Sequence, residues 1–113
     1  MSSFIKNTKE VNQIVIIETD GYLNKEGGEA IAAICYEKIK AGQVKFLINM
    51  ATTKVVNSIG VSILIEIIEK LQEVDGKIGY YNLAPIVSKT FNIMGLTKYS
   101  TVFSTEEEAL VDL

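Results

Sequence analysis

Apolar residues recur along this chain with two different periods, and these periods divide it into strands and helices. Short runs rich in β-branched and aromatic residues, bounded by polar residues or glycine, predict strands. The predicted strands are residues 4–8, 13–19, 44–50, 77–83 and 101–103. Apolar residues spaced three and four positions apart predict helices. The predicted helices are residues 25–41, 58–75, 85–94 and a last one that opens with a capping box at residues 104–107.

Turn-forming residues separate these elements. The polar link at residues 9–12 predicts a hairpin between the first two strands, and Asp-Gly at residues 20–21 predicts a turn. Gly42 and Gly95 follow helical segments, and we expect them to end those helices in the left-handed conformation. Pro85 suits the first turn of a helix, where its missing N–H costs nothing.

The segment at residues 58–75 carries the clearest helical pattern. One stripe is apolar and is expected to be buried: Val61, Leu64, Ile65, Ile68 and Leu71, flanked by Ile63, Ile67 and Val74. The opposite face is polar and is expected to be solvated: Ser62, Glu66, Glu69 and Glu73.

The order of the elements predicts the fold class. Helices alternate with strands from residue 13 onward, and the links between them are short. This order is typical of an α/β fold with right-handed crossovers. We expect one domain over residues 1–113, with a mixed, mostly parallel sheet of about four to five strands and about four helices. A chain of 113 residues can bury a hydrophobic core without a metal or a disulfide.

Composition argues against several classes of protein. A net charge of -3 and a pI near 5.0 argue against a general nucleic-acid binder, which needs a basic surface. No apolar run is long enough to cross a bilayer, and the N-terminus lacks the layout of a signal peptide. The single cysteine, Cys35, lies on an apolar helix face and indicates a small core side chain in a reducing compartment. We therefore expect a cytoplasmic protein that neither binds nucleic acid nor inserts into a membrane.

The absence of histidine narrows the possible chemistry further. It removes Ser-His-Asp and Cys-His nucleophiles, His-ligated zinc and the commonest general base. The carboxylates fall mostly on helix faces that indicate solvated positions. Glu106, Glu107 and Glu108 are interpreted as charge near a helix start. We expect no enzyme, no metal and no cofactor, and an enzyme that uses carboxylates is the least favoured alternative.

Residues 56–64, Val-Asn-Ser-Ile-Gly-Val-Ser-Ile-Leu, lead into the helix at residues 58–75. They resemble Asp-Ser-(Ser/Thr)-Gly-(Leu/Val)-Gly, the signature loop of the STAS family, which includes the anti-sigma factor antagonists. An alignment without a gap sets Asn57 at the Asp, Ser58 at the first Ser, Ile59 at the phosphorylated Ser or Thr, Gly60 at the first Gly and Ser62 at the second Gly. The resemblance implies a regulatory loop without its phosphoacceptor, because isoleucine cannot accept phosphate.

Other segments are similar to the same family. Residues 21–24, Gly-Tyr-Leu-Asn, resemble its Gly-x-(Leu/Ile)-(Asp/Asn) segment before the first helix. Residues 77–83 followed by Pro85, then Met-Gly-Leu at residues 94–96 and the closing Ser-x-x-Glu-Glu-Ala stretch, also look like family features. Together these segments cover nearly the whole chain and imply the STAS fold.

Two interpretations stay open for the loop residues. Asn57 and Ser58 both favour helix N-caps, since their side chains accept bonds from free N–H groups of the first turn. The resemblance adds that they belong, with Asn24, to a surface that faces a kinase. Ile59 is either partly buried or an exposed contact for a partner protein. Gly60 is expected to allow close packing or an unstrained turn.

The resemblance implies a protein-binding regulator that binds an ATP-dependent anti-sigma kinase and frees a sigma factor. A phosphoryl group adds about -1.5 to -2 charges at such an interface, and Ile59 would remove this switch. Ser58 is the fallback acceptor, but a shift of one residue rotates the side chain by about 100° around the helix. Two other functions stay open: a scaffold or accessory subunit of a signalling or transport complex, and a domain that binds a small ligand or nucleotide.

Overall fold

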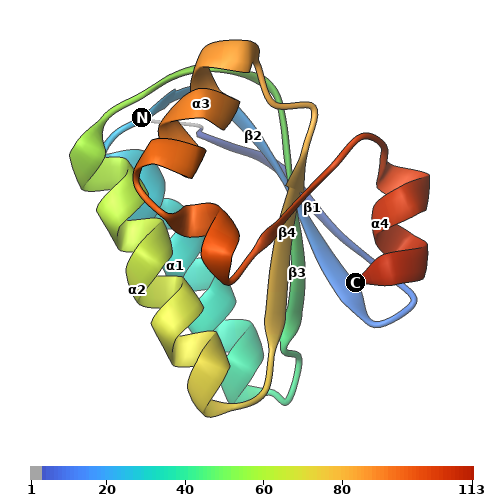
Figure 1. Ribbon diagram of the computed structural model, residues 1–113. Coiled ribbons are helices and arrows are strands. Elements are labelled where there is room, and N and C mark those ends of the chain that lie inside the picture. The colour runs from blue at the N-terminus through green and yellow to red at the C-terminus, as the bar shows by residue number, and fades with distance from the viewer. Residues whose placement is uncertain (1–3) are drawn as a thin grey trace.

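Three parallel strands extend the sheet of this protein outward from an N-terminal hairpin (Figure 1). The computed structural model describes residues 4–113. The strands are β1 (Ile5–Val11), β2 (Ile14–Leu23), β3 (Lys45–Val56), β4 (Lys77–Tyr81) and β5 (Thr101–Phe103). The helices are α1 (Lys25–Lys40), α2 (Ser58–Glu73), α3 (Pro85–Ile93), the 3-10 turn η1 (Leu96–Lys98) and α4 (Glu106–Asp112). Within the described residues the strand order is β1-β2-β3-β4-β5, and β1 pairs antiparallel with β2.

The helices divide between the two faces of the sheet. Because the strands follow one another across the sheet in sequence order, each crossover steps in the same direction. Right-handed crossovers of this kind place their helices on one face. Helices α1, α2 and α3 cover that face, and α4 lies across the other (Figure 1). The larger core fills the space under the three helices, around Leu64 and Phe91, and the smaller core around Phe103 lies under α4. The predicted α/β fold with a mixed, mostly parallel sheet is confirmed.

The hairpin and the end of β2 differ from the sequence prediction. β1 continues through Val11, and the chain reverses at Asn12 and Gln13, whose φ angles of 52° and 68° are left-handed. Such angles are typical of a two-residue hairpin turn. The predicted link at residues 9–12 is therefore wrong, because an exposed edge strand accepts polar side chains. The predicted turn at residues 20–21 is a bulge within β2, with Gly21 at φ 104°.

β3 also extends further than the pattern predicts, through Ala51 and the polar residues 52–54 to Val56. Threonine hydroxyl groups join this extension to β2. The Oγ1 atoms of Thr19 and Thr53 lie 2.7 Å apart, and Thr52 Oγ1 donates to the Thr19 carbonyl oxygen at 3.0 Å. A run of polar residues thus forms a strand because its hydroxyl groups find partners on the neighbouring strand.

The long helix α2 is present as predicted, with its buried face rotated slightly. Leu64 and Ile67 are fully buried. Ile65, one residue and therefore about 100° beyond Leu64, is only half-buried. Val74, at the end of the helix, is 39% exposed. The prediction that Ile65 belongs to the buried stripe is therefore wrong. Ile67, which was predicted to flank the stripe, belongs to it instead.

The predicted helix ends are largely confirmed. Gly42 and Gly95 have left-handed φ angles of 91° and 84° after α1 and α3. The cap of α4 lies one residue later than predicted: Thr105 Oγ1 accepts a bond from the Glu108 N–H at 3.1 Å, and the Glu108 carboxylate accepts one from the Ser104 N–H at 2.9 Å.

Candidate functional site

Helices α1 and α2 begin side by side where two parallel strands end. Leu23 of β2 pairs with Val56 of β3, and the next residues, Asn24 and Asn57, are the N-caps of α1 and α2. Because the carboxyl ends of parallel strands meet at one edge of a sheet, both helix starts lie at that edge. The loop that resembles the family signature is therefore not isolated, since the start of α1 lies beside it.

The two asparagines cap their helices in the same way. The Asn24 side-chain oxygen accepts a bond from the Gly27 N–H at 3.0 Å, and that of Asn57 accepts one from the Gly60 N–H at 2.9 Å. The Asn57 N–H also donates to the Leu23 carbonyl oxygen at 3.0 Å, which ties the β3–α2 link to β2. The N-cap interpretation is confirmed for Asn57.

At Gly60, α2 lies close to the β2–α1 link at Leu23 and Asn24. A Cβ atom at this position would lie 2.9 Å from the Asn24 carbonyl oxygen and closer still to the Leu23 carbonyl group. Gly28 of α1 has a related role, because a Cβ atom there would lie 3.2 Å from the Gly60 carbonyl oxygen and 3.0 Å from the Ile63 side chain. The close packing expected of Gly60 is confirmed, and it holds the two helix starts together.

Ser58 and Ile59 lie on the outside of this arrangement. Ser58 is the first residue of α2 and is exposed, and its carbonyl oxygen accepts a bond from Ser62 Oγ at 2.7 Å. The N-cap interpretation is therefore wrong for Ser58, because the neighbouring Asn57 occupies that position. Ile59 is 54% exposed. The structure brings Asn24, Asn57 and Gly60 together by contact and leaves Ser58 and Ile59 free to meet another molecule.

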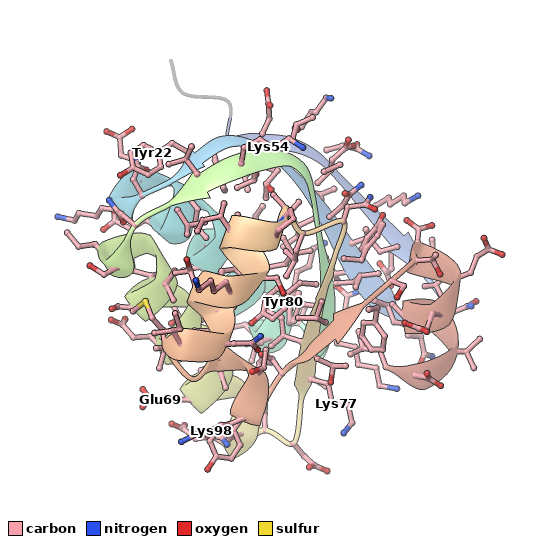
Figure 2. The ribbon with its side chains drawn as sticks, turned by 45° about the horizontal axis from the view of Figure 1, so that its top comes forward. Tyr22, Lys54, Glu69, Lys77, Tyr80 and Lys98 are labelled. Atoms are coloured by element: carbon pink, nitrogen blue, oxygen red, sulfur yellow. The ribbon has the colours of Figure 1, made fainter. Side chains whose placement is uncertain are left out.

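Two further exposed apolar residues flank the caps, and the sequence analysis did not identify them. Tyr22 is 46% exposed and Val55 is 55% exposed, and the two are register partners on β2 and β3. Figure 2 shows Tyr22 and Lys54 near the end of the molecule where these strands run into the helices. In the sequence, the alternation of side chains along β3 could have indicated that Val55 is exposed. We call Tyr22, Val55, Ser58 and Ile59 the helix-start surface.

Three further points bear on function: the state of the Cys35 thiol, whether metal ligands form a group, and whether a helix could span a membrane. Cys35 is fully buried, and burial raises the pKa of its thiol to about 12, so the group is a protonated core side chain at neutral pH. Within residues 4–113, no three Cys, Asp or Glu side chains are grouped so that they could hold a metal ion. No helix in the described part of the chain has the length and apolar character needed to cross a membrane.

Comparison with known families agrees with this architecture. Residues 6–109 match the family model described as STAS domain. The chain belongs to the STAS domain family. No curated protein sequence matches this STAS domain at a significant level.

Several solved structures resemble this STAS domain over nearly their whole length. The Bacillus cell fate determinant SpoIIAA in its phosphorylated form is 26% identical, with a TM-score of 0.73 over 93% of this chain and 96% of that one. An anti-sigma factor antagonist from Mycobacterium paratuberculosis is 18% identical, with a TM-score of 0.78 over 93% and 89%. A variant of RsbS from Moorella thermoacetica is 16% identical, with a TM-score of 0.77 over 97% of each chain. The last two likenesses show the fold alone.

Proposed function

We propose that this STAS domain is a protein-binding regulator of the anti-sigma factor antagonist type, and that it binds an ATP-dependent anti-sigma kinase through the helix-start surface. In this proposal residue 59 is a permanent contact and carries no phosphate switch. The observation that carries the proposal is the 54% exposure of Ile59 at the second position of α2.

The exposed apolar side chains supply the attraction for a protein partner. Ile59, Val55 and Tyr22 are each about half exposed, and none is required there by the core. Covering the exposed half of one such side chain stabilises a complex by roughly 1 kcal/mol. Several such contacts around a rigid centre give the apolar middle that protein interfaces need. The capped helix starts provide that rigidity, because Asn24 and Asn57 fix the backbone from which Ile59 projects.

The same place would suit a phosphate if a hydroxyl group were available. Free N–H groups and the positive end of the helix dipole favour an anion at a helix start. Ile59 has no atom that could carry the phosphoryl group. Ser58 has a hydroxyl group, but it lies about 100° around the helix from residue 59. Binding is then controlled by the amounts of the proteins or by competition for the surface. The proposal includes no catalytic step.

Restoring a hydroxyl group at residue 59 tests the proposal. The wild-type protein and the Ile59→Ser variant are each incubated with ATP and a purified anti-sigma kinase that binds the wild type. We expect no phosphate on the wild type, which stays bound. We expect one phosphate on the variant and release of the kinase, because a phosphoryl group adds about -1.5 to -2 charges. Intact-mass analysis with peptide mapping measures the modification, and size-exclusion chromatography measures the complex.

The Ile59→Ala variant is the matched control, because it removes the apolar contact without adding a hydroxyl group. We expect it to gain no phosphate and to bind about fivefold more weakly. A stoichiometric phosphate on Ser58 that releases the kinase would contradict the absence of a switch. Failure of every anti-sigma kinase of the source organism to bind would contradict the partner class.

A further inference from the structure

The outer surface of the α1–α2 pair carries an apolar groove of about 530 Å³. Its apolar lining comes from Ala32, Ala33 and Tyr36 of α1 and from Ile59 and Ile63 of α2. The two alanines leave room between the helices for a side chain from another molecule. We call this surface the α1–α2 groove.

The rims of the groove carry an excess of negative charge. Glu29 of α1 and Glu66 of α2 line it, with Lys25 near the start of α1. Among residues 4–113, neither Glu29 nor Glu66 forms an ion pair with another side chain. Burial, and then the negative charge of Glu66, raise the pKa of the Tyr36 hydroxyl group. An occupant with a positive charge between apolar side chains would therefore fit the groove, because Glu29 and Glu66 line it without an ion-pair partner among the described residues.

Helix α3 of the same protein has that chemistry on its outer face. Ile86 is 60% exposed and Ile93 is 74% exposed. They are seven residues apart, so they project from nearly the same side of the helix. Lys89 lies between them, is exposed, and forms no ion pair with any described residue. We call Ile86, Lys89 and Ile93 the α3 stripe.

The lengths of the two surfaces match. Ile93 lies seven positions after Ile86 in the stripe, and Glu66 lies seven positions after Ile59 on the α2 side of the groove. Each span is about 10 Å at a rise of about 1.5 Å per residue. The stripe cannot reach the groove of its own copy. Ile65 and Ile68 of α2 face η1 and the end of α3 at Met94, whereas Ile59 and Glu66 face α1, so α2 separates the two surfaces.

We propose that the α3 stripe of one copy docks into the α1–α2 groove of a second copy. Lys89 then faces Glu29 and Glu66, and the two isoleucines contact the apolar lining. Like charges disfavour two symmetric contacts. A contact between two stripes would bring two Lys89 side chains together, and a contact between two grooves would bring their glutamates together. The contact is therefore head to tail, and each bound copy keeps one free stripe or one free groove.

This association does not depend on the proposed function, but it affects the same residue. Ile59 belongs to both the α1–α2 groove and the helix-start surface. A second copy in the groove covers Ile59, so an occupied groove and a bound protein partner exclude each other on the same copy.

Sedimentation velocity on the purified protein alone tests the head-to-tail contact. The concentration range runs from about 10 µM to about 1 mM, where small interfaces typically dissociate. We expect the average sedimentation coefficient of the wild type to rise across this range. Glu66→Lys and Lys89→Glu each place like charges at the contact and should weaken association about tenfold or more. Glu107→Lys makes the same exchange on α4, across the sheet, and should leave association unchanged.

Mixing tests whether one intact stripe and one intact groove are enough for the contact, and the effect of each single variant separates this contact from a symmetric one. One partner in an equimolar mixture of the two single variants keeps an intact stripe and the other keeps an intact groove, so we expect association to return. The Glu66→Lys/Lys89→Glu double variant should also associate, since the charges are exchanged. Circular dichroism confirms that each variant is folded. A monomeric wild type throughout the range, a single variant that associates like the wild type, or a mixture that stays monomeric would each overturn the proposal.

Discussion

At Gly60, α2 comes so near the β2–α1 link that a methyl group has no room. The nearest atoms are backbone atoms of Leu23 and Asn24, which cannot move aside as a flexible side chain could. The sequence indicated close packing at Gly60 but could not name the partner atoms, because they come from the link before α1. It also could not decide between Asn57 and Ser58 as the cap. Both residue types cap well, and the choice depends on which one precedes the first helical turn.

A Gly60→Ala substitution should therefore destabilise the protein. We expect the free energy of unfolding to fall by about 1–3 kcal/mol or more, because overpacking against backbone outweighs the better helix propensity of alanine. Urea unfolding measures the change. Gly28→Ala is the matched control in the first turns of α1, where the nearest atoms belong to the Ile63 side chain, and its cost should be smaller. Equal stability of the wild type and the Gly60→Ala variant would contradict the contact.

At the scale of elements, the sequence predicted every strand and α-helix of residues 4–113 but not the 3-10 turn η1, and it missed several element ends. Apolar periodicity carries no information where a strand is polar, as at residues 52–54, since pairing there depends on the hydroxyl groups of β2. The buried side of α2 shows a similar limit. The pattern places both Ile65 and Ile67 near the apolar face, and only the positions of α1 and the sheet decide which is covered.

Substitutions along α2 should reproduce the observed burial. We expect Ile67→Ala to lower the free energy of unfolding by about 2–5 kcal/mol, as is typical of fully buried isoleucines. Ile65→Ala should cost clearly less, because Ile65 is half-buried. Both variants lose the same atoms, so the comparison isolates burial. Thermal or urea unfolding gives the two values. An Ile65→Ala cost equal to or above that of Ile67→Ala would contradict the orientation of α2 against the sheet.

At the scale of the whole molecule, the two cores on opposite faces of the sheet hold protonated groups. Burial raises the pKa of Cys35 from 9.0 to about 12 and raises the pKa values of Tyr80 and Tyr81 above the usual 10.0. Tyr81 also donates a hydrogen bond to the Glu106 carboxylate at 2.7 Å, which favours its protonated form. These three groups bind their protons more tightly in the folded protein than in the unfolded chain.

Stability should therefore decrease in alkaline solution. A raised pKa contributes stability that is present below the unfolded value and lost as the pH rises through the folded one. We expect the free energy of unfolding to fall as the pH rises above 9.0, where the thiol of the unfolded chain ionises, and more steeply above 10.0. Urea unfolding at several pH values measures the slope. For a Tyr81→Phe variant, the free energy of unfolding should fall less steeply over the same pH range. A fall as steep as that of the wild type would contradict the contribution of Tyr81.

The strand order β1-β2-β3-β4-β5 has a consequence for how this chain folds during synthesis. Each strand pairs with the one made just before it, so no finished pair has to open for a later strand to enter. Every new strand with its helix can dock on an edge that already exists as it leaves the ribosome. Pairing between neighbours in sequence also keeps the loops to be closed short, which favours rapid folding. The growing end of the sheet is therefore the edge that awaits its next strand until β5 and α4 emerge.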